Sequence, residues 1–244
     1  MIEQKVLTRG RAAIVYDGRQ GRKISAEMFA PQYWREHDAV VGEASGRGVT
    51  LYVDAGGEQW VLRPYRRGGM FARLVERTYL FTGQSRTRCF REFAVLARLH
   101  ELSMPVPQPV GAWFERSGLV YRAALLTLRI ADSETLARRL RSGPLAPETW
   151  LAVGRCLRGF HDIGLCHADL NAHNILIDGS GRIYVIDMDR ARFREPGGAW
   201  SRSNLARLRR SLNKVSVEEG AEFRGDRDWA ALKAGYAHSP ARAS

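Results

Sequence analysis

Two pairs of short segments in the first half of the chain alternate apolar and polar side chains with a period of two. The first pair is 49–53 and 59–63, rich in β-branched and aromatic residues and separated by the turn sequence DAGG at 54–57. The second pair is 111–115 and 119–126. A period of two is typical of strands with one buried face. The pattern therefore predicts an antiparallel β-sheet built from hairpins.

After residue 87 the apolar spacing lengthens to that of a helix. One stripe of this helix is formed by Phe93, Leu96, Ala97 and His100. Proline cannot continue a helix, because it lacks a backbone donor and clashes with the preceding turn. The helix is therefore expected to end before the cluster Pro105, Pro107 and Pro109.

A second helix is predicted from Pro147, because proline fits the first helical turn and apolar residues then recur at helical spacing. These residues are Trp150, Val153, Leu157 and Phe160. Two short apolar strands follow at 175–177 and 183–186, joined by a glycine-containing turn. The remainder is expected to be helical, including 205–214 and 229–236.

Residues before about 40 follow no clear period and predict no element, although they contain an aromatic cluster at Phe29, Tyr33 and Trp34. Downstream, a sheet with one long helix precedes a mostly helical remainder. We therefore expect an α+β fold with two lobes in a single domain. The expected N-terminal lobe is 1–127 and the expected C-terminal lobe is 128–244.

The composition fits a folded protein, since 45% of the 244 residues are hydrophobic. No apolar run approaches the ~18 residues that a membrane-spanning helix needs. The first residues contain no hydrophobic segment of the kind that a secretory signal requires, so we expect the protein to stay in the cytosol. The three cysteines are far apart and odd in number, which favours reduced thiols over a disulfide framework.

The formal net charge of +12 favours phosphate-rich partners, namely nucleic acid, anionic lipid or a phosphorylated substrate. The excess is uneven, because residues 63–91 contain eight arginines and a single acid, Glu76, with aromatic side chains between them. This pattern suits a lipid-facing patch. A solvated basic face and a nucleic-acid patch are the alternatives. For Arg207, Arg209 and Arg210 the alternatives are contact with sugar phosphates or with water alone.

Three polar residues fit the chemistry of phosphoryl transfer, which needs metal ions on the phosphates and a carboxylate near the acceptor hydroxyl. Asp169 and Asn174 lie on a loop between a predicted helix and a hairpin, and Asp187 closes that hairpin. Hard oxygen ligands from Asn174 and Asp187 suit Mg²⁺. The alternative is a turn or capping network, since Asp and Asn favour loops, and Asp187 by itself could merely end a strand.

The segment 167–174 (HADLNAHN) resembles the kinase catalytic loop H-R-D-x-x-x-x-N, and 187–189 (DMD) resembles the D-F-G element. The spacing matches although the letters vary. The resemblance implies that Asp169 is the catalytic base or orients the acceptor hydroxyl. It also implies that Asn174 and Asp187 are the metal ligands.

By the same resemblance, His167 is a structural residue that braces the loop. Ala168 stands where the kinase pattern has arginine. The usual arginine link to a phosphorylated activation loop is then missing, so we expect no control by phosphorylation of such a loop.

Gly46 and Gly48 precede the first predicted hairpin and resemble a phosphate-binding loop, because glycine lets backbone N–H groups approach ATP. A plain flexible turn is an equal alternative. The strand that ends at Arg63 resembles the kinase strand V-A-I-K, with arginine in the place of the phosphate-binding lysine. Arginine keeps the charge but not the geometry of lysine, and Glu92 on the long helix is its expected partner.

Three longer segments indicate which kinase family the chain resembles. It looks like the 3-deoxy-D-manno-octulosonic acid (Kdo) kinase family at 61–69 (VLRPYRRGG), 87–92 (TRCFRE) and 105–109 (PVPQP). That family is similar to the lipopolysaccharide core heptose kinases and has a bilobal protein-kinase-like fold. The resemblance implies binding of ATP and Mg²⁺ between the lobes and transfer of phosphate to the 4-hydroxyl of Kdo on Kdo-lipid A. It further implies a peripheral protein at the cytoplasmic face of the bacterial inner membrane, with no nucleic-acid partner.

The alternative is a small-molecule kinase of the aminoglycoside or choline phosphotransferase type, whose loop H-G-D-x-x-x-x-N fits 167–174 equally well. The upstream segment from Arg63 to Glu92 favours the Kdo kinase family over it. A third class is a basic RNA- or membrane-binding module on an inactive kinase fold. The intact spacing of the catalytic residues disfavours that class.

Overall fold

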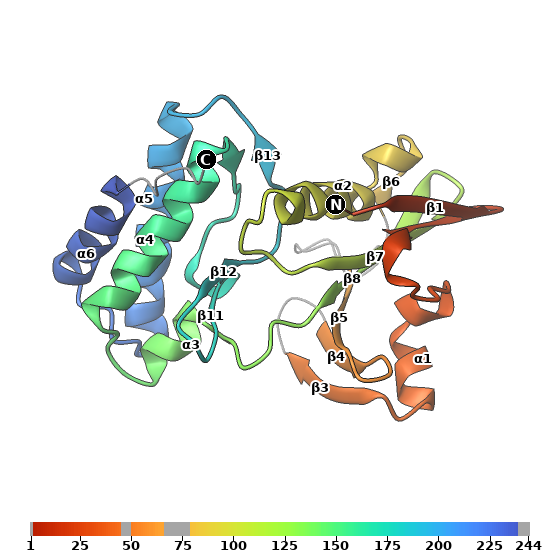
Figure 1. Ribbon diagram of the computed structural model, residues 1–244, viewed down its shortest axis with the longest axis horizontal. Helices are drawn as coiled ribbons and strands as arrows, with labels where there is room; N and C mark the ends of the chain where they lie inside the picture. The colour runs from red at the N-terminus through yellow and green to blue at the C-terminus, as the bar shows by residue number, and fades with distance from the viewer. Residues whose placement is uncertain (1, 45–49, 66–78, 239–244) are drawn as a thin grey trace. The chain divides into compact units, whose positions relative to one another are not determined.

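The computed structural model describes residues 2–44, 50–65 and 79–238, and the chain divides into two compact units (Figure 1). Unit 1 comprises Met1–Leu102 and Pro107–Arg129, and unit 2 comprises Ser103–Val106 and Ile130–Ser244. Ser103–Val106 lies in unit 2, whereas the sequence pattern placed it in the first lobe. The reason is local, because the carbonyl oxygen of Pro105 accepts a hydrogen bond from the backbone N–H of Val185 at 3.0 Å.

Unit 1 is built on an antiparallel sheet with the strand order β1-β2-β7-β8-β5-β4-β3, and β6 also pairs with β8. The strands are β1 Gln4–Arg9, β2 Ala12–Asp17, β3 Val40–Ala44, β4 Thr50–Asp54, β5 Gln59–Pro64, β6 Tyr79–Leu80, β7 Pro109–Ser117 and β8 Val120–Leu128. The two predicted hairpins are β4–β5 and β7–β8, with Val53 opposite Trp60 and Phe114 opposite Ala123. The predicted antiparallel sheet is confirmed.

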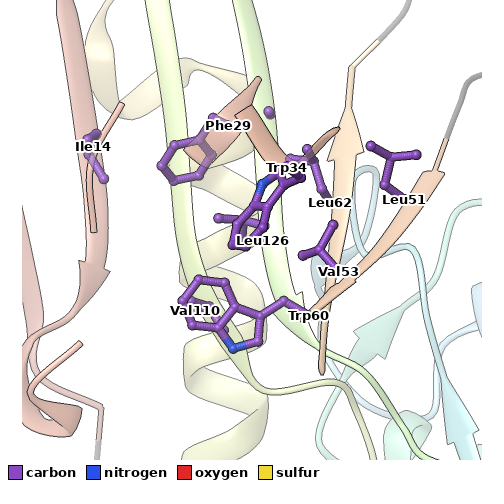
Figure 2. Packing of buried hydrophobic residues seen from close by; sticks show 10 residues of the cluster. Ile14, Phe29, Trp34, Leu51, Val53, Trp60, Leu62, Val110 and Leu126 are labelled. Atoms are coloured by element: carbon purple, nitrogen blue, oxygen red, sulfur yellow. The ribbon is translucent and has the colours of Figure 1, made fainter. Parts of the chain in front are cut away.

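One face of the sheet packs against two short helices, η2 Glu27–Phe29 and α1 Pro31–Glu36. Figure 2 shows Trp34 of α1 among Leu62, Leu126 and the other apolar residues of this cluster. The Trp34 ring also meets the Trp60 ring edge-on, with 5.9 Å between their centroids. The sequence pattern predicted neither helix, because such short helices do not complete two turns and show no apolar period.

The other face of the sheet packs against α2 Arg88–Glu101, which runs along β7 and β8 (Figure 1). Alternation along β7 sends Trp113 to the cluster of Figure 2 and Phe114 to α2, where its ring meets Phe90 at 5.2 Å between centroids. The predicted helix is confirmed, but its stripe was wrong at one position. His100 is exposed and Leu99 is fully buried, although about 100° per residue sets His100 on the same side of the helix as Phe93; His100 lies in the last turn of α2.

Unit 2 is mainly helical, with α3 Leu136–Arg141, α4 Pro147–Asp162, α5 Ala199–Glu219 and α6 Asp226–Ala237. Pro147 opens α4 and the predicted apolar stripe of this helix is buried. The helices α4 and α6 approach each other at glycines. A Cβ atom on Gly154 would lie 2.1 Å from the carbonyl oxygen of Leu232, so no larger residue fits there without a backbone shift.

Short strands and 3-10 helices complete the two units. In unit 2, β11 Ile175–Ile177 pairs with β12 Ile183–Val185 and with β9 Glu134–Thr135, and β10 Leu165–Cys166 pairs with β13 Arg192–Phe193. The 3-10 helices are η1 Gly18–Gln20 and η3 Gln84–Arg86 in unit 1 and η4 Ala172–Asn174 in unit 2. The predicted hairpin at 175–177 and 183–186 is confirmed, with its second strand ending one residue earlier, at Val185.

The three cysteines are free. Burial raises the pKa of the Cys89 and Cys156 thiols to about 12, so both are protonated and unreactive at neutral pH. Among the described residues, no helix combines the length and the apolar character that crossing a bilayer requires.

Candidate active site

The segment 167–174 lies in unit 2 between β10 and β11, and His167 joins it to the end of β12. The Nδ1 atom of His167 accepts the backbone N–H of Asp169 at 3.3 Å, so the ring proton is on Nε2. Nε2 donates to the carbonyl oxygen of Ile186 at 2.9 Å. His167 is buried, and its ring therefore ties the loop to the residue that precedes Asp187.

The backbone of Asp169 is held on both sides while its carboxylate is left in solvent. Its N–H donates to His167, and its carbonyl oxygen accepts from the Nδ2 atoms of Asn171 at 2.9 Å and Asn174 at 3.0 Å. The Asp169 side chain is 55% exposed, and its Oδ1 atom lies 3.7 Å from Nη1 of Arg207. A carboxylate on a fixed backbone with open access is what a base for an incoming hydroxyl requires.

The two predicted metal ligands, Asn174 and Asp187, are brought together by the backbone. The N–H of Ile186 donates to the carbonyl oxygen of Asn174 at 3.0 Å, which sets Asp187 next to η4. The amide nitrogen of Asn174 is used by Asp169, so the side chain turns its Oδ1 acceptor away from that bond. Asp187 has φ +65°, a left-handed conformation that Asp tolerates better than most residues.

One asparagine and one aspartate fit Mg²⁺, which prefers oxygen ligands and takes most of its coordination from phosphates and water. Within the described parts of the chain, no group of three or more His, Cys, Asp and Glu side chains is arranged to hold a metal ion. His161, His167 and His173 stand six residues apart in the sequence, and in this described part of the chain they belong to no such group. Burial lowers the pKa of His161 to about 4, so that its ring is neutral at pH 7.

The helix α5 provides an anchor for the loop that the sequence analysis did not identify. Asn204 is buried, and its Oδ1 accepts the backbone N–H of His167 at 3.1 Å. Its Nδ2 donates to the carbonyl oxygen of the same residue at 2.9 Å. About two helix turns further on, Ser211 Oγ accepts the N–H of Ala172 at 3.1 Å. The loop is thus bound at both of its ends by one face of α5.

Replacing Asn204 by alanine is expected to destabilise unit 2 and slow turnover. Two buried backbone groups of His167 lose their partners, and each unsatisfied group costs about 1–3 kcal/mol. The loss should lower the melting temperature and, through the loosened loop, kcat more than the KM for ATP. Asn213→Ala is the matched control, since Asn213 is an exposed residue of the same helix. Equal melting temperatures for the two variants would contradict the anchoring function.

In unit 1, Arg63 and Glu92 form the ion pair that the sequence predicted. The period of two along β5 buries Leu62 in the cluster of Figure 2 and turns Arg63 to the face of α2. There Arg63 Nη1 lies 3.0 Å from Glu92 Oε1, with the glutamate side chain fully buried. Tyr65 donates its hydroxyl to the other carboxylate oxygen of Glu92.

The state of Tyr65 is fixed by its surroundings. Burial, and then the negative charge of Glu92, raise the pKa of the Tyr65 hydroxyl well above its ordinary value, so it stays a donor at all physiological pH values. Arg63 retains 28% exposure of its side chain, so this residue is not sealed from solvent. The pair thus combines a buried anchor with a partly accessible cation.

Several predicted residues lie outside the described residues. Gly46 and Gly48 are among them, and so are the arginines at 66, 67, 73 and 77 of the arginine-rich segment. The phosphate-loop and lipid-patch predictions for these residues stay predictions. Of the basic residues on α5, Arg209 is paired with Asp226 and stacks on Trp229, whereas Arg207 lies beside Asp169.

Comparison with known proteins identifies similar sequences over nearly the whole chain. The sequence model described as the lipopolysaccharide kinase (Kdo/WaaP) family matches residues 31–236. A 3-deoxy-D-manno-octulosonic acid kinase of Stenotrophomonas maltophilia (strain K279a) is 44% identical over 229 residues, covering 93% of this chain and 90% of that protein. A protein of the same description from Vibrio vulnificus (strain CMCP6) is 40% identical over 236 residues, covering 97% of this chain and 98% of that protein.

Proposed function

Because the chain belongs to the lipopolysaccharide kinase (Kdo/WaaP) family, and is a kinase, we propose that it phosphorylates Kdo in the assembly of the lipopolysaccharide core. The proposed reaction transfers the γ-phosphoryl group of ATP to the 4-hydroxyl of Kdo on Kdo-lipid A. The observation that carries the proposal is the loop around Asp169, with a fixed backbone and an open carboxylate.

In this proposal Asp169 receives the acceptor hydroxyl. Its carboxylate accepts the hydrogen bond from the 4-hydroxyl, orients that oxygen toward the γ-phosphorus and takes up the proton as the new P–O bond forms. The bond between the γ-phosphorus and the β,γ-bridging oxygen breaks, and ADP leaves. His167, Asn171 and Asn174 hold the backbone of Asp169 during these changes, so little reorganisation is needed.

The remaining site residues would bind the phosphates. Asn174 and Asp187 offer the oxygen ligands for Mg²⁺, which when bound neutralises charge on the phosphate oxygens. Arg63 takes the position of the usual kinase lysine, and Glu92 and Tyr65 fix the direction of its side chain. We infer that the guanidinium binds a phosphate oxygen.

We also propose that the protein works as a peripheral protein at the cytoplasmic face of the inner membrane. The support is the net charge of +12 and the membrane-embedded nature of the proposed acceptor. Flotation with vesicles of anionic phospholipid should carry the protein upward at low salt and less so at high salt, because surface attraction is screened. Vesicles of neutral lipid are the control, and equal flotation with both would contradict the proposal.

The function is tested by incubating the purified protein with labelled Mg-ATP and a panel of acceptors. The panel contains Kdo-lipid A, lipid A without Kdo, an aminoglycoside and choline. We expect label only on Kdo-lipid A, with the phosphate located on O4 of Kdo. Label on the aminoglycoside or choline, with none on Kdo-lipid A, would assign the protein to the small-molecule kinase alternative.

A further inference from the structure

The face of α5 that contacts the loop bears three polar residues in order along the helix. Asn204 binds the backbone of His167, and Ser211 binds the backbone of Ala172. Arg207 lies between them and meets the side chain of Asp169, with 3.7 Å between Nη1 and Oδ1. The first and last of these contacts fasten the loop, whereas the middle one reaches the proposed catalytic carboxylate itself.

The contact between Arg207 and Asp169 is not built to hold the loop. At 3.7 Å it exceeds hydrogen-bond length, and the two side chains are 48% and 55% exposed. Exposed ion pairs of this kind add little to stability. The backbone of Asp169 is already fixed by three other hydrogen bonds. The guanidinium therefore has donors to spare beside the place where the acceptor hydroxyl would bind.

The proposed acceptor carries a carboxylate that could accept hydrogen bonds from the Arg207 guanidinium. Kdo is a sugar acid whose carboxylate is attached to C2, two ring carbons from C4, so an acceptor that presents its 4-hydroxyl to Asp169 brings a second carboxylate close to the first. Two carboxylates at short range repel each other strongly unless a cation lies nearby. The planar fork of arginine matches a carboxylate with two parallel hydrogen bonds.

We propose that Arg207 binds the carboxylate of the acceptor sugar and thereby selects sugar acids over neutral or cationic sugars. This inference rests on the proposed function. It assigns Arg207 to the acceptor, in contrast to two other uses of the same cation. One is to hold the Asp169 side chain in place, and the other is to stabilise the γ-phosphoryl group during transfer.

The test compares two acceptors, Kdo-lipid A and the same molecule with the Kdo carboxylate converted to its methyl ester. The unmodified protein should have a KM for the ester at least about tenfold higher, because a charge-assisted hydrogen bond is lost. Arg207→Ala should raise the KM for the acid at least about tenfold, leave the KM for ATP unchanged and show no preference between acid and ester. Arg207→Lys should recover part of the preference.

Arg202→Ala is the matched control, since Arg202 is exposed on the same helix and five residues away, about 140° round the helix axis. It should behave as the unmodified protein. An Arg207→Ala variant that still prefers the acid, or that loses kcat equally on both acceptors, overturns the inference and leaves the proposed function standing. An unmodified protein that labels neither acceptor overturns the proposed function, and the inference with it.

Discussion

Exchanging Asp169 for asparagine should lower turnover by about a hundredfold to ten-thousandfold, the range found for loss of a general base. The amide cannot take up the proton of the acceptor hydroxyl, although its size and shape are the same. The folded structure should be unaffected, because the carboxylate is 55% exposed and the loop is fixed through backbone atoms. Steady-state kinetics with Kdo-lipid A and thermal unfolding measure the two effects.

The matched control is Asp226→Asn. Asp226 is an exposed carboxylate of the same unit that also pairs with an arginine of α5, but Arg209, its partner, is on the helix face away from the loop. This variant should keep full turnover. If Asp169→Asn retained more than about a tenth of the normal rate, Asp169 would not be the base, given the range above.

Replacing Glu92 by methionine should destabilise unit 1 by about 3–5 kcal/mol, the cost of breaking a buried ion pair by removing one partner. Glu92 is fully buried, and its carboxylate binds both Arg63 and the Tyr65 hydroxyl. Chemical denaturation followed by tryptophan fluorescence would report the loss, since Trp34 and Trp60 lie in the core of this unit.

The double variant Arg63→Met with Glu92→Met separates stability from function. Replacing both members of a buried pair by apolar residues is often neutral, so the double variant should regain part of the lost stability. Its turnover should stay low and its KM for ATP high, because no cation remains on β5 to grip a phosphate. A stable double variant with normal ATP kinetics would show that Arg63 serves the fold alone.

The parts of the fold with strong periodicity could be predicted from the sequence, and the parts without it could not. The hairpins of unit 1 and the helix α4 bury one face each, so apolar residues recur in their sequences at the spacing of a strand or a helix. β1 is different, because all six of its residues are exposed and nothing distinguishes one face from the other. Its position is set by pairing with β2, which no local pattern records.

The candidate site also contains residues that could be predicted from the sequence and residues that could not. Asp169, Asn174 and Asp187 were found because their spacing along the chain is short and matches a known pattern. Asn204 contacts His167 across 37 sequence positions, and Ser211 contacts Ala172 across 39. In the sequence both stand in a polar, arginine-rich helix and look like surface residues. The signal for Asn204 would be the buried stripe of α5 at positions 204, 208, 212 and 215, to which Ser211 does not belong.

The division of the chain into two units affects which fragments can fold and in what order the contacts form during synthesis. The polypeptide enters unit 2 at Ser103–Val106, returns to unit 1 at Pro107 and leaves it again after Arg129. A fragment beginning at Ile130 would therefore lack Pro105, and the N–H of Val185, two residues before Asp187, would have no acceptor there. During synthesis, Pro105 leaves the ribosome 80 residues ahead of Val185. The hydrogen bond between the two residues, which lies close to the proposed metal ligand Asp187, can therefore form only after Val185 has been made.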